Sequence, residues 1–264
     1  MGLIYSQDFI TVADASIAAR SSTAGYNKID VMDYWHLKAR HRAADLTKSD
    51  ISPLFKINMG AVKTVSSVLL LDVNYDVTRV FGHASSLASD WSAASYDSTD
   101  VDVSQNPWTG RYNAYIPLTG FNYQFLAVGT PAAASAVGSY QTYWQTGLVC
   151  ILDSATELSM DYSMMRQSTE QLFENVGRSG RVSLSNVPGW IGEVSFGERR
   201  RSLETELRTL GQVNLATPVM FYLNDGNTSE AYICLLDQGY SSEWFGYDAV
   251  RGGQSMRFRE IIGA

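Results

Sequence analysis

Two neighbouring apolar segments, residues 55–59 and 65–73, constrain the fold more than any other part of this sequence. Three apolar residues alternate with polar ones in the first segment: Phe55, Ile57 and Met59. This is the period of a strand with one buried face. The second segment is apolar over most of its length and short enough to be a core strand. Because Gly60 lies between them, we predict a sandwich strand, a glycine turn and a second sandwich strand.

The composition is that of a soluble globular protein with one large or two medium domains. The chain has 264 residues, of which 45% are hydrophobic and 18% charged, so it can bury a sizeable core. It contains 15 Tyr, 10 Phe and 6 Trp. Aromatic residues are enriched in strands and at interfaces, which favours β structure and contact surfaces.

The formal net charge of −7 argues against a dedicated nucleic-acid binder, which would carry a basic footprint. The first residues lack the basic start and apolar core of a signal peptide, and no apolar stretch reaches the roughly 18 residues of a membrane span. We therefore expect a soluble protein made in the cytoplasm. The two cysteines, Cys150 and Cys234, sit in apolar runs and are expected to be buried thiols without a disulfide.

A stretch of small residues, 130–139, is the best domain boundary in the chain. We therefore predict one domain over 1–130 and a second over 131–264. In the second domain, leucines spaced along one face predict a helix that ends before Gly211. The elements expected there are two strands around an Asn-Val-Pro-Gly turn at 186–189, this helix, and three further strands: residues 181–184, 190–196, 198–210, 219–223, 232–236 and 256–262.

Two parts of the sequence resemble known families. The segment from Phe55 to Val65, followed by Leu71-Asp-Val-Asn74, resembles the core of galactose-binding-like jelly-roll sandwiches. The part from Gly147 onward resembles the ring-forming domain of phage distal tail proteins. The motifs that carry the second resemblance occur in the family's order: a Gly-Arg hairpin at 180–183, the aromatic strand 190–196, one helix at 198–210, a Pro-Val strand start at 218–219 and a closing strand at 256–262.

This resemblance implies a mainly β fold, with a jelly-roll β-sandwich followed by a small β-barrel carrying one α-helix. It also implies a virion structural protein that forms a ring at the distal end of a phage tail. Such a ring, of six copies or alternatively three, joins the tail-tube protein to the tail-tip hub, spike and receptor-binding proteins of the baseplate. An acidic chain suits a lumen wall past which DNA slides. No catalysis and no cofactor are expected.

Two groups of residues are candidates for contacts between subunits. Three cations near the start of the predicted helix are unfavourable for its dipole and would gain from acidic partners on a neighbour: Arg199, Arg200 and Arg201. A polar-flanked aromatic cluster has the residue types that dominate interface hot spots: Trp244, Phe245 and Tyr247. The alternative for the cluster is a hairpin packed on the barrel.

Other chemistries find little support. His36 and His41 have no standard metal spacing. The loop that holds Asp97, Asp100 and Asp102 lacks the glycine and the closing glutamate of an EF-hand. Carboxylate pairs for glycoside hydrolysis could be drawn from Asp72, Asp76 and Glu193, but no spacing requires them. The main rival to the ring subunit is therefore a carbohydrate-binding module in which the sandwich contacts host-surface glycan; an enzyme that degrades polysaccharide is the third class.

Overall fold

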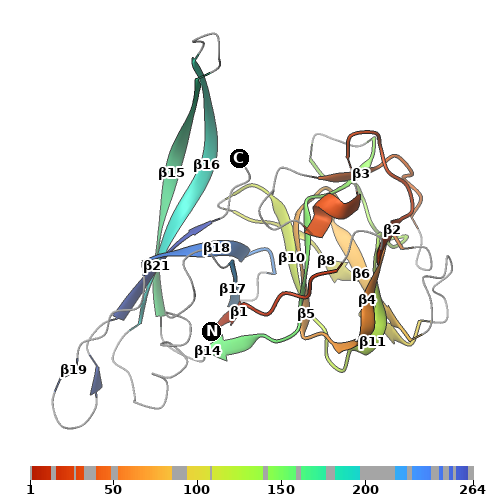
Figure 1. Ribbon diagram of the computed structural model, residues 1–264, viewed down its shortest axis with the longest axis horizontal. Helices are drawn as coiled ribbons and strands as arrows, with labels where there is room; N and C mark the ends of the chain where they lie inside the picture. Colours follow the sequence, from red (N-terminus) through yellow and green to blue (C-terminus); the bar gives the residue numbers. More distant parts are fainter. Residues whose placement is uncertain are drawn as a thin grey trace.

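The computed structural model shows a mainly β protein in which every paired strand runs antiparallel to its neighbour (Figure 1). It describes residues 2–12, 16–26, 28–32, 40–48, 53–84, 94–107, 109–138, 142–158, 162–176, 182–196, 218–224, 228–238, 244–245, 250–251 and 254–260. These residues include a short 3-10 helix, η2 (Lys28–Met32). None of them forms an α-helix. The predicted helix over 198–210 lies outside the described residues.

Two sheets form the predicted β-sandwich. One has the strand order β2-β4-β11-β6-β7, with β8 also paired to β6, and the other has the order β13-β5-β10-β9. The strands of the first sheet are β2 (Ile17–Ala19), β4 (Phe55–Thr64), β6 (Val77–His83), β7 (Tyr96–Asp97), β8 (Val101–Asp102) and β11 (Asn122–Gly129). Those of the second are β5 (Ser67–Val73), β9 (Ser104–Gln105), β10 (Tyr112–Pro117) and β13 (Leu148–Leu152).

The sandwich core explains the alternation seen in the sequence. Phe55, Ile57 and Met59 are buried, whereas Lys56 and Asn58 between them are only partly so. The buried residues meet Leu126 and Val128 of their own sheet and the inward-facing residues of the opposite sheet in one apolar cluster. Alternating side chains from two facing sheets are how a sandwich fills its core.

Strand β5 is buried on both faces, which is why its sequence is apolar without alternation. Val68 and Leu70 belong to the sandwich core. Leu69 and Leu71 point the other way and join a second cluster with residues of two strands from a third sheet, among them Met220 and Ile233. The described part of the molecule is therefore three sheets deep at β5, and the predicted core strand is confirmed.

The predicted turn at Gly60 is wrong, because β4 continues through it to Thr64. Tyr123 of β11 pairs with Lys63, and Phe125 pairs with Asn58, so four residues of β4 lie opposite one residue of β11. Gly60 has φ of +80°, a conformation that glycine adopts at little cost. The glycine therefore permits a bulge that bends the strand where the sequence pattern suggested that the strand ends.

The third sheet has seven strands in the order β14-β1-β17-β18-β21-β16-β15. They are β1 (Gly2–Ser6), β14 (Thr156–Leu158), β15 (Tyr162–Val176), β16 (Val182–Phe196), β17 (Val219–Asn224), β18 (Ala231–Gln238) and β21 (Gln254–Glu260). The three strands predicted over 219–223, 232–236 and 256–262 correspond to β17, β18 and β21.

The two edge strands of this sheet are consecutive in the chain, which requires the sheet to curl. Only residues 159–161 connect β14 to β15, so Leu158 and Tyr162 are at most about 14 Å apart. In a flat sheet, six strand spacings would separate the two edges by about 29 Å. The sheet therefore brings its first and last strands near each other.

The predicted turn at residues 186–189 is also wrong, because β16 runs through it without a break. Asn186 pairs with Leu172, and Pro188 pairs with Glu170. Strand β16 pairs with β21 over Ile191–Phe196, so at Pro188 it has a neighbour on one side alone among the described residues. A proline is tolerated at such an edge because its missing N–H faces away from the partner strand.

Strand pairing crosses the predicted domain boundary in both directions. β1, from the start of the chain, lies in the seven-stranded sheet, and β13, after residue 131, lies in the sandwich. The division at 130/131 itself stays a prediction.

Cys150 and Cys234 are buried free thiols, as predicted. None of the described helical residues forms a helix long and apolar enough to cross a membrane.

Candidate functional site

A short ribbon at one side of the sandwich positions the candidate site. β3 (His41–Ala43) pairs with β12 (Trp144–Thr146), with Ala43 opposite Trp144. The Trp144 side chain is only 1% exposed and belongs to the sandwich core. Its ring meets the ring of Tyr75 edge-on, with centroids 6.1 Å apart. The Tyr75 hydroxyl in turn shares a buried hydrogen bond of 3.2 Å with the Thr146 hydroxyl. This bond fixes the ring of Tyr75 against the indole.

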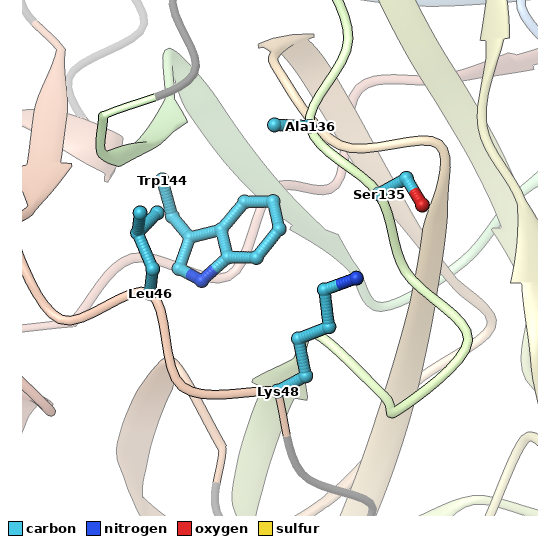
Figure 2. Close-up of a pocket in the computed structure, with 5 residues that line it drawn as sticks. All are labelled: Leu46, Lys48, Ser135, Ala136 and Trp144. Carbon is cyan, nitrogen blue, oxygen red and sulfur yellow. The ribbon is translucent and has the colours of Figure 1, made fainter.

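A cavity of about 340 Å³ opens beside this tryptophan (Figure 2). Its lining comes from three segments: the loop after β3, the loop after β11 and β12 itself. The residues are Leu46, Lys48, Ser135, Ala136 and Trp144. Leu46 and Ala136 offer apolar surface, whereas Lys48 and Ser135 offer an ammonium and a hydroxyl. The volume is at the lower end of the range for small-ligand sites.

The indole N–H of Trp144 is a buried donor with no hydrogen-bond acceptor among the residues that the structure describes. Figure 2 shows the indole nitrogen on the side of the ring that faces the loop carrying Leu46 and Lys48. Buried N–H groups are nearly always paired with protein or water. An acceptor on a ligand in the cavity would satisfy this one.

Two described carboxylates beside the cavity, Asp45 and Asp76, are held by other groups. Asp76 accepts the backbone N–H of Ser135 at 2.5 Å. Asp45 accepts the hydroxyl of Thr47 at 2.5 Å and its backbone N–H at 2.9 Å, and it pairs with Arg20 at 3.4 Å. The Thr47 bonds are the main reason that the pKa of Asp45 is lowered. Neither carboxylate lines the cavity.

The ribbon next to the cavity is rich in cations and aromatic rings. The Arg42 guanidinium lies 4.0 Å from the ring centre of Tyr26 and 4.4 Å from that of Tyr143, a cation–π arrangement. Arg40 pairs with Asp72 at 2.6 Å. The Arg42 guanidinium is therefore held between two aromatic rings, and the Arg40 charge is balanced by Asp72.

His41 adds no charge to this ribbon at neutral pH. Its side chain is buried, and its Nε2 lies 2.9 Å from the Ser21 carbonyl and 3.0 Å from the Ser22 hydroxyl. Burial lowers the pKa of His41 to about 4, against a smaller raising effect of the Ser21 carbonyl. The ring is thus a neutral donor to Ser21. Across the described residues, no group of three or more His, Cys, Asp or Glu is arranged to hold a metal ion.

The predicted interface residues are only partly within the described structure. Arg199, Arg200, Arg201 and Tyr247 lie outside it. Trp244 and Phe245 form β19 (Trp244–Phe245), which pairs with β20 (Val250–Arg251). The two strands pair with each other, and both the packing of this hairpin on the barrel and its contact with a neighbouring subunit stay predictions.

The sequence reasoning missed the cavity. Lys48 and Trp144 are far apart in the chain, and no motif or period connects them. Only the pairing of β3 with β12 brings the two segments together. The one local signal was a tryptophan next to a run of apolar residues, which also fits an ordinary core position.

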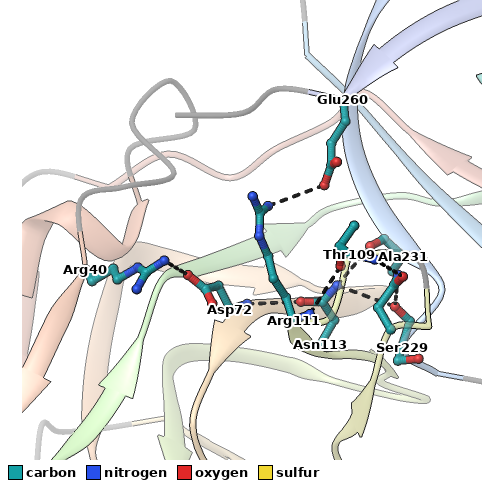
Figure 3. Close-up of polar contacts among 9 residues, drawn as sticks. Arg40, Asp72, Thr109, Arg111, Asn113, Ser229, Ala231 and Glu260 are labelled. Atoms are coloured by element: carbon teal, nitrogen blue, oxygen red, sulfur yellow. Dashed lines mark hydrogen bonds and ion pairs between the residues drawn. The ribbon is translucent and has the colours of Figure 1, made fainter. Parts of the chain in front are cut away.

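A second polar cluster joins the sandwich to the seven-stranded sheet (Figure 3). The side-chain amides of Asn106 and Asn113 donate to the backbone carbonyl of Ser229, at 2.9 and 3.4 Å. Arg111 reaches Glu260 of β21 at 3.4 Å. Burial raises the pKa of Glu260 to about 7, against the lowering effect of Arg111. These contacts fix the two parts to each other and use no group that the cavity needs.

Comparison with known proteins gives structural matches only. No protein-family model and no curated protein matches this sequence. A lectin domain of lectinolysin in complex with Lewis b antigen matches with a TM-score of 0.34 and 10% identity, over 52% of this chain and 92% of that one. A histidine mutant of that domain with Lewis b matches with a TM-score of 0.34 and 10% identity, over 55% and 99%. A fucose-binding module of Streptococcus pneumoniae has a TM-score of 0.33 and 9% identity, over 51% and 90%.

Proposed function

We propose that this chain is a virion structural protein that assembles with copies of itself into a ring at the distal end of a phage tail. In this role it joins the tail tube to the tail-tip hub and spike, and it performs no catalysis. It is made in the host cytoplasm and ends in the virion. The proposal combines the resemblance of residues 147–264 to distal tail proteins with one structural observation, the arm described next.

The arm consists of residues 168–176 of β15 and 182–190 of β16. Their nine residue pairs have no third strand beside them among the described residues. At about 3.3 Å per residue the arm is about 30 Å long, and it projects away from the other sheets (Figure 1). An isolated two-stranded ribbon is marginally stable in water. A neighbouring subunit that covers the arm would stabilise this ribbon. The projecting arm is the observation that carries the proposal.

The curled seven-stranded sheet supports the same assignment. Its edges are brought together by the short connection between β14 and β15, as the β-barrel of a ring-forming domain requires. Identical subunits that meet through two different patches close into a ring when the rotation per subunit permits. We propose six copies, with three as the alternative.

The test is the mass of the full chain in solution, by light scattering over a range of concentrations. We expect a closed oligomer for the natural chain and a monomer when residues 173–185 are replaced by an Asn-Gly turn, which leaves the pair Leu172–Asn186 to close the shorter ribbon. The control is Val62→Asp, which changes a 55% exposed hydrophobic residue of the sandwich. A natural chain that stays monomeric at every concentration, or a shortened arm that leaves the oligomer intact, contradicts the proposal.

A second function, carbohydrate binding by the sandwich, is favoured by the cavity beside Trp144. The cavity combines apolar walls with hydrogen-bonding groups, and sugars present both kinds of surface. The two functions are compatible, since a ring subunit at a tail tip could also contact host-surface glycan. A glycan array probed with the full chain tests this second function, and saturable binding that Trp144→Phe weakens is the expected result.

A further inference from the structure

We propose that the cavity lined by Lys48, Ser135 and Trp144 binds an anionic sugar, with the Lys48 ammonium paired to a carboxylate on the sugar ring. This inference deepens the carbohydrate-binding function and rests on it. It is independent of the ring proposal, because the cavity lies on the sandwich and the arm belongs to the seven-stranded sheet.

Three hydrogen-bond donors line the cavity. Trp144 is 1% exposed, and its indole N–H has no acceptor among the described residues. Ser135 and Lys48 add a hydroxyl and an ammonium group. A buried donor without an acceptor costs free energy, so a ligand oxygen placed in the cavity gains more there than at an open surface.

The charge of the lining favours an anionic ligand. Lys48 is exposed and forms no ion pair with a residue that the structure describes. Two described acidic side chains lie beside the lining: Asp45, which precedes Leu46 in the chain, and Asp76, between β5 and β6. They are held by Thr47, Arg20 and the Ser135 backbone. The described lining therefore contains one cation and no carboxylate, and a negative group on the ligand is favoured over a positive one.

The shape of the cavity suits a single sugar ring. Leu46 and Ala136 give the cavity apolar walls, which suit the C–H face of a sugar ring. The volume of about 340 Å³ fits one such ring with its substituents and excludes a long chain lying fully inside. A carboxylate-bearing sugar unit, such as a uronic acid, combines an apolar face, hydroxyl acceptors for the indole N–H and a charge for Lys48.

The experiment is calorimetric titration of the full chain with methyl glucuronide, methyl glucoside and glucose 1-phosphate. We expect methyl glucuronide to bind about tenfold more tightly than methyl glucoside, near the lower end of the range for one hydrogen bond to a charged group, because Lys48 is exposed. Lys48→Gln should abolish this preference. Lys63→Gln, at an exposed lysine of β4 outside the cavity, should leave it unchanged. Trp144→Phe keeps an aromatic ring and removes the N–H, and should weaken binding of both methyl glycosides.

The possible results distinguish binding of an anionic sugar from carbohydrate binding in general. Equal affinity for methyl glucuronide and methyl glucoside, or a preference that survives Lys48→Gln, overturns the anionic ligand and leaves carbohydrate binding standing. Tighter binding of glucose 1-phosphate than of methyl glucuronide overturns the carboxylate in favour of a phosphate. Absence of binding to all three ligands overturns this inference, while a positive glycan array would still support carbohydrate binding elsewhere on the chain.

Discussion

Strand β5 and the arm are both β structure, but they are stabilised in different ways. β5 is covered on its two faces, by the sandwich core on one side and by residues of β17 and β18 on the other. The arm consists of residue pairs that have no third strand beside them within the described part of the chain. Backbone pairing is common to both, but β5 also has a paired strand on each side and apolar clusters on its two faces. We therefore expect the sandwich to be stable by itself and the arm to depend on what it contacts.

Hydrogen exchange should show the largest difference between these regions. The amides of β5 are expected to exchange only on global unfolding, whereas those of residues 168–176 should exchange by local opening at a much lower free energy. In the monomeric state this difference spans most of the stability of the protein, on the order of 5 kcal/mol or more. In the assembled state the arm amides should become protected. Equal protection of both regions in a monomer would show that the arm is as stable as β5 without a neighbouring subunit.

A matched pair of leucine substitutions tests whether burial stabilises β5 more than the arm. Leu70→Ala removes a fully buried side chain from the sandwich core and should lower the unfolding free energy by about 2–5 kcal/mol. Leu184→Ala lies in the arm, where none of the described strands pairs as a third, and should change the unfolding free energy of the monomer by less than about 1 kcal/mol. Urea unfolding of both variants measures this. An equal loss for the two substitutions would show that the arm is packed in the monomer.

The junction between the two parts should respond to pH through Glu260. Its pKa is raised from the ordinary 4.5 to about 7, mainly by burial. The folded state therefore disfavours the ionised carboxylate, and this penalty develops as pH rises from about 4.5 to about 7 and is complete above that. Glu260→Gln should remove it, so that the variant gains on the order of 1–3 kcal/mol over the natural chain at pH 8 and about nothing at pH 4.

The measurement is urea unfolding of both chains between pH 4 and pH 8. Asp153→Asn, at an exposed carboxylate in the sequence between β13 and β14, is the control and should follow the profile of the natural chain. If Glu260→Gln has the same pH profile as the natural chain, the carboxyl of Glu260 is not desolvated at the junction. That result would weaken the picture of two parts fixed to each other through buried polar contacts.

Local patterns predicted most of the strands but not how far they extend. The alternation at Phe55, Ile57 and Met59 and the continuous run through Leu70 gave the sandwich strands correctly, because the period of side chains reports burial. The sequence predicts turns at Gly60 and Pro188, although a strand continues through each of them. A glycine can support a bulge and a proline can occupy a free strand edge. Neither role can be distinguished from a turn without knowing the neighbouring strand.

The sequence alone determined that this protein is mainly β, that its cysteines are buried thiols and that residues 65–73 lie in a core. Burial and period are local properties, and each residue carries its own part of that information. Only the tertiary structure placed β1 in the sheet of the C-terminal part, made β5 the middle of three layers and brought Lys48 to Trp144. Each of these depends on which strands pair across long stretches of chain, and pairing is selected by the total packing of the core rather than by any one segment.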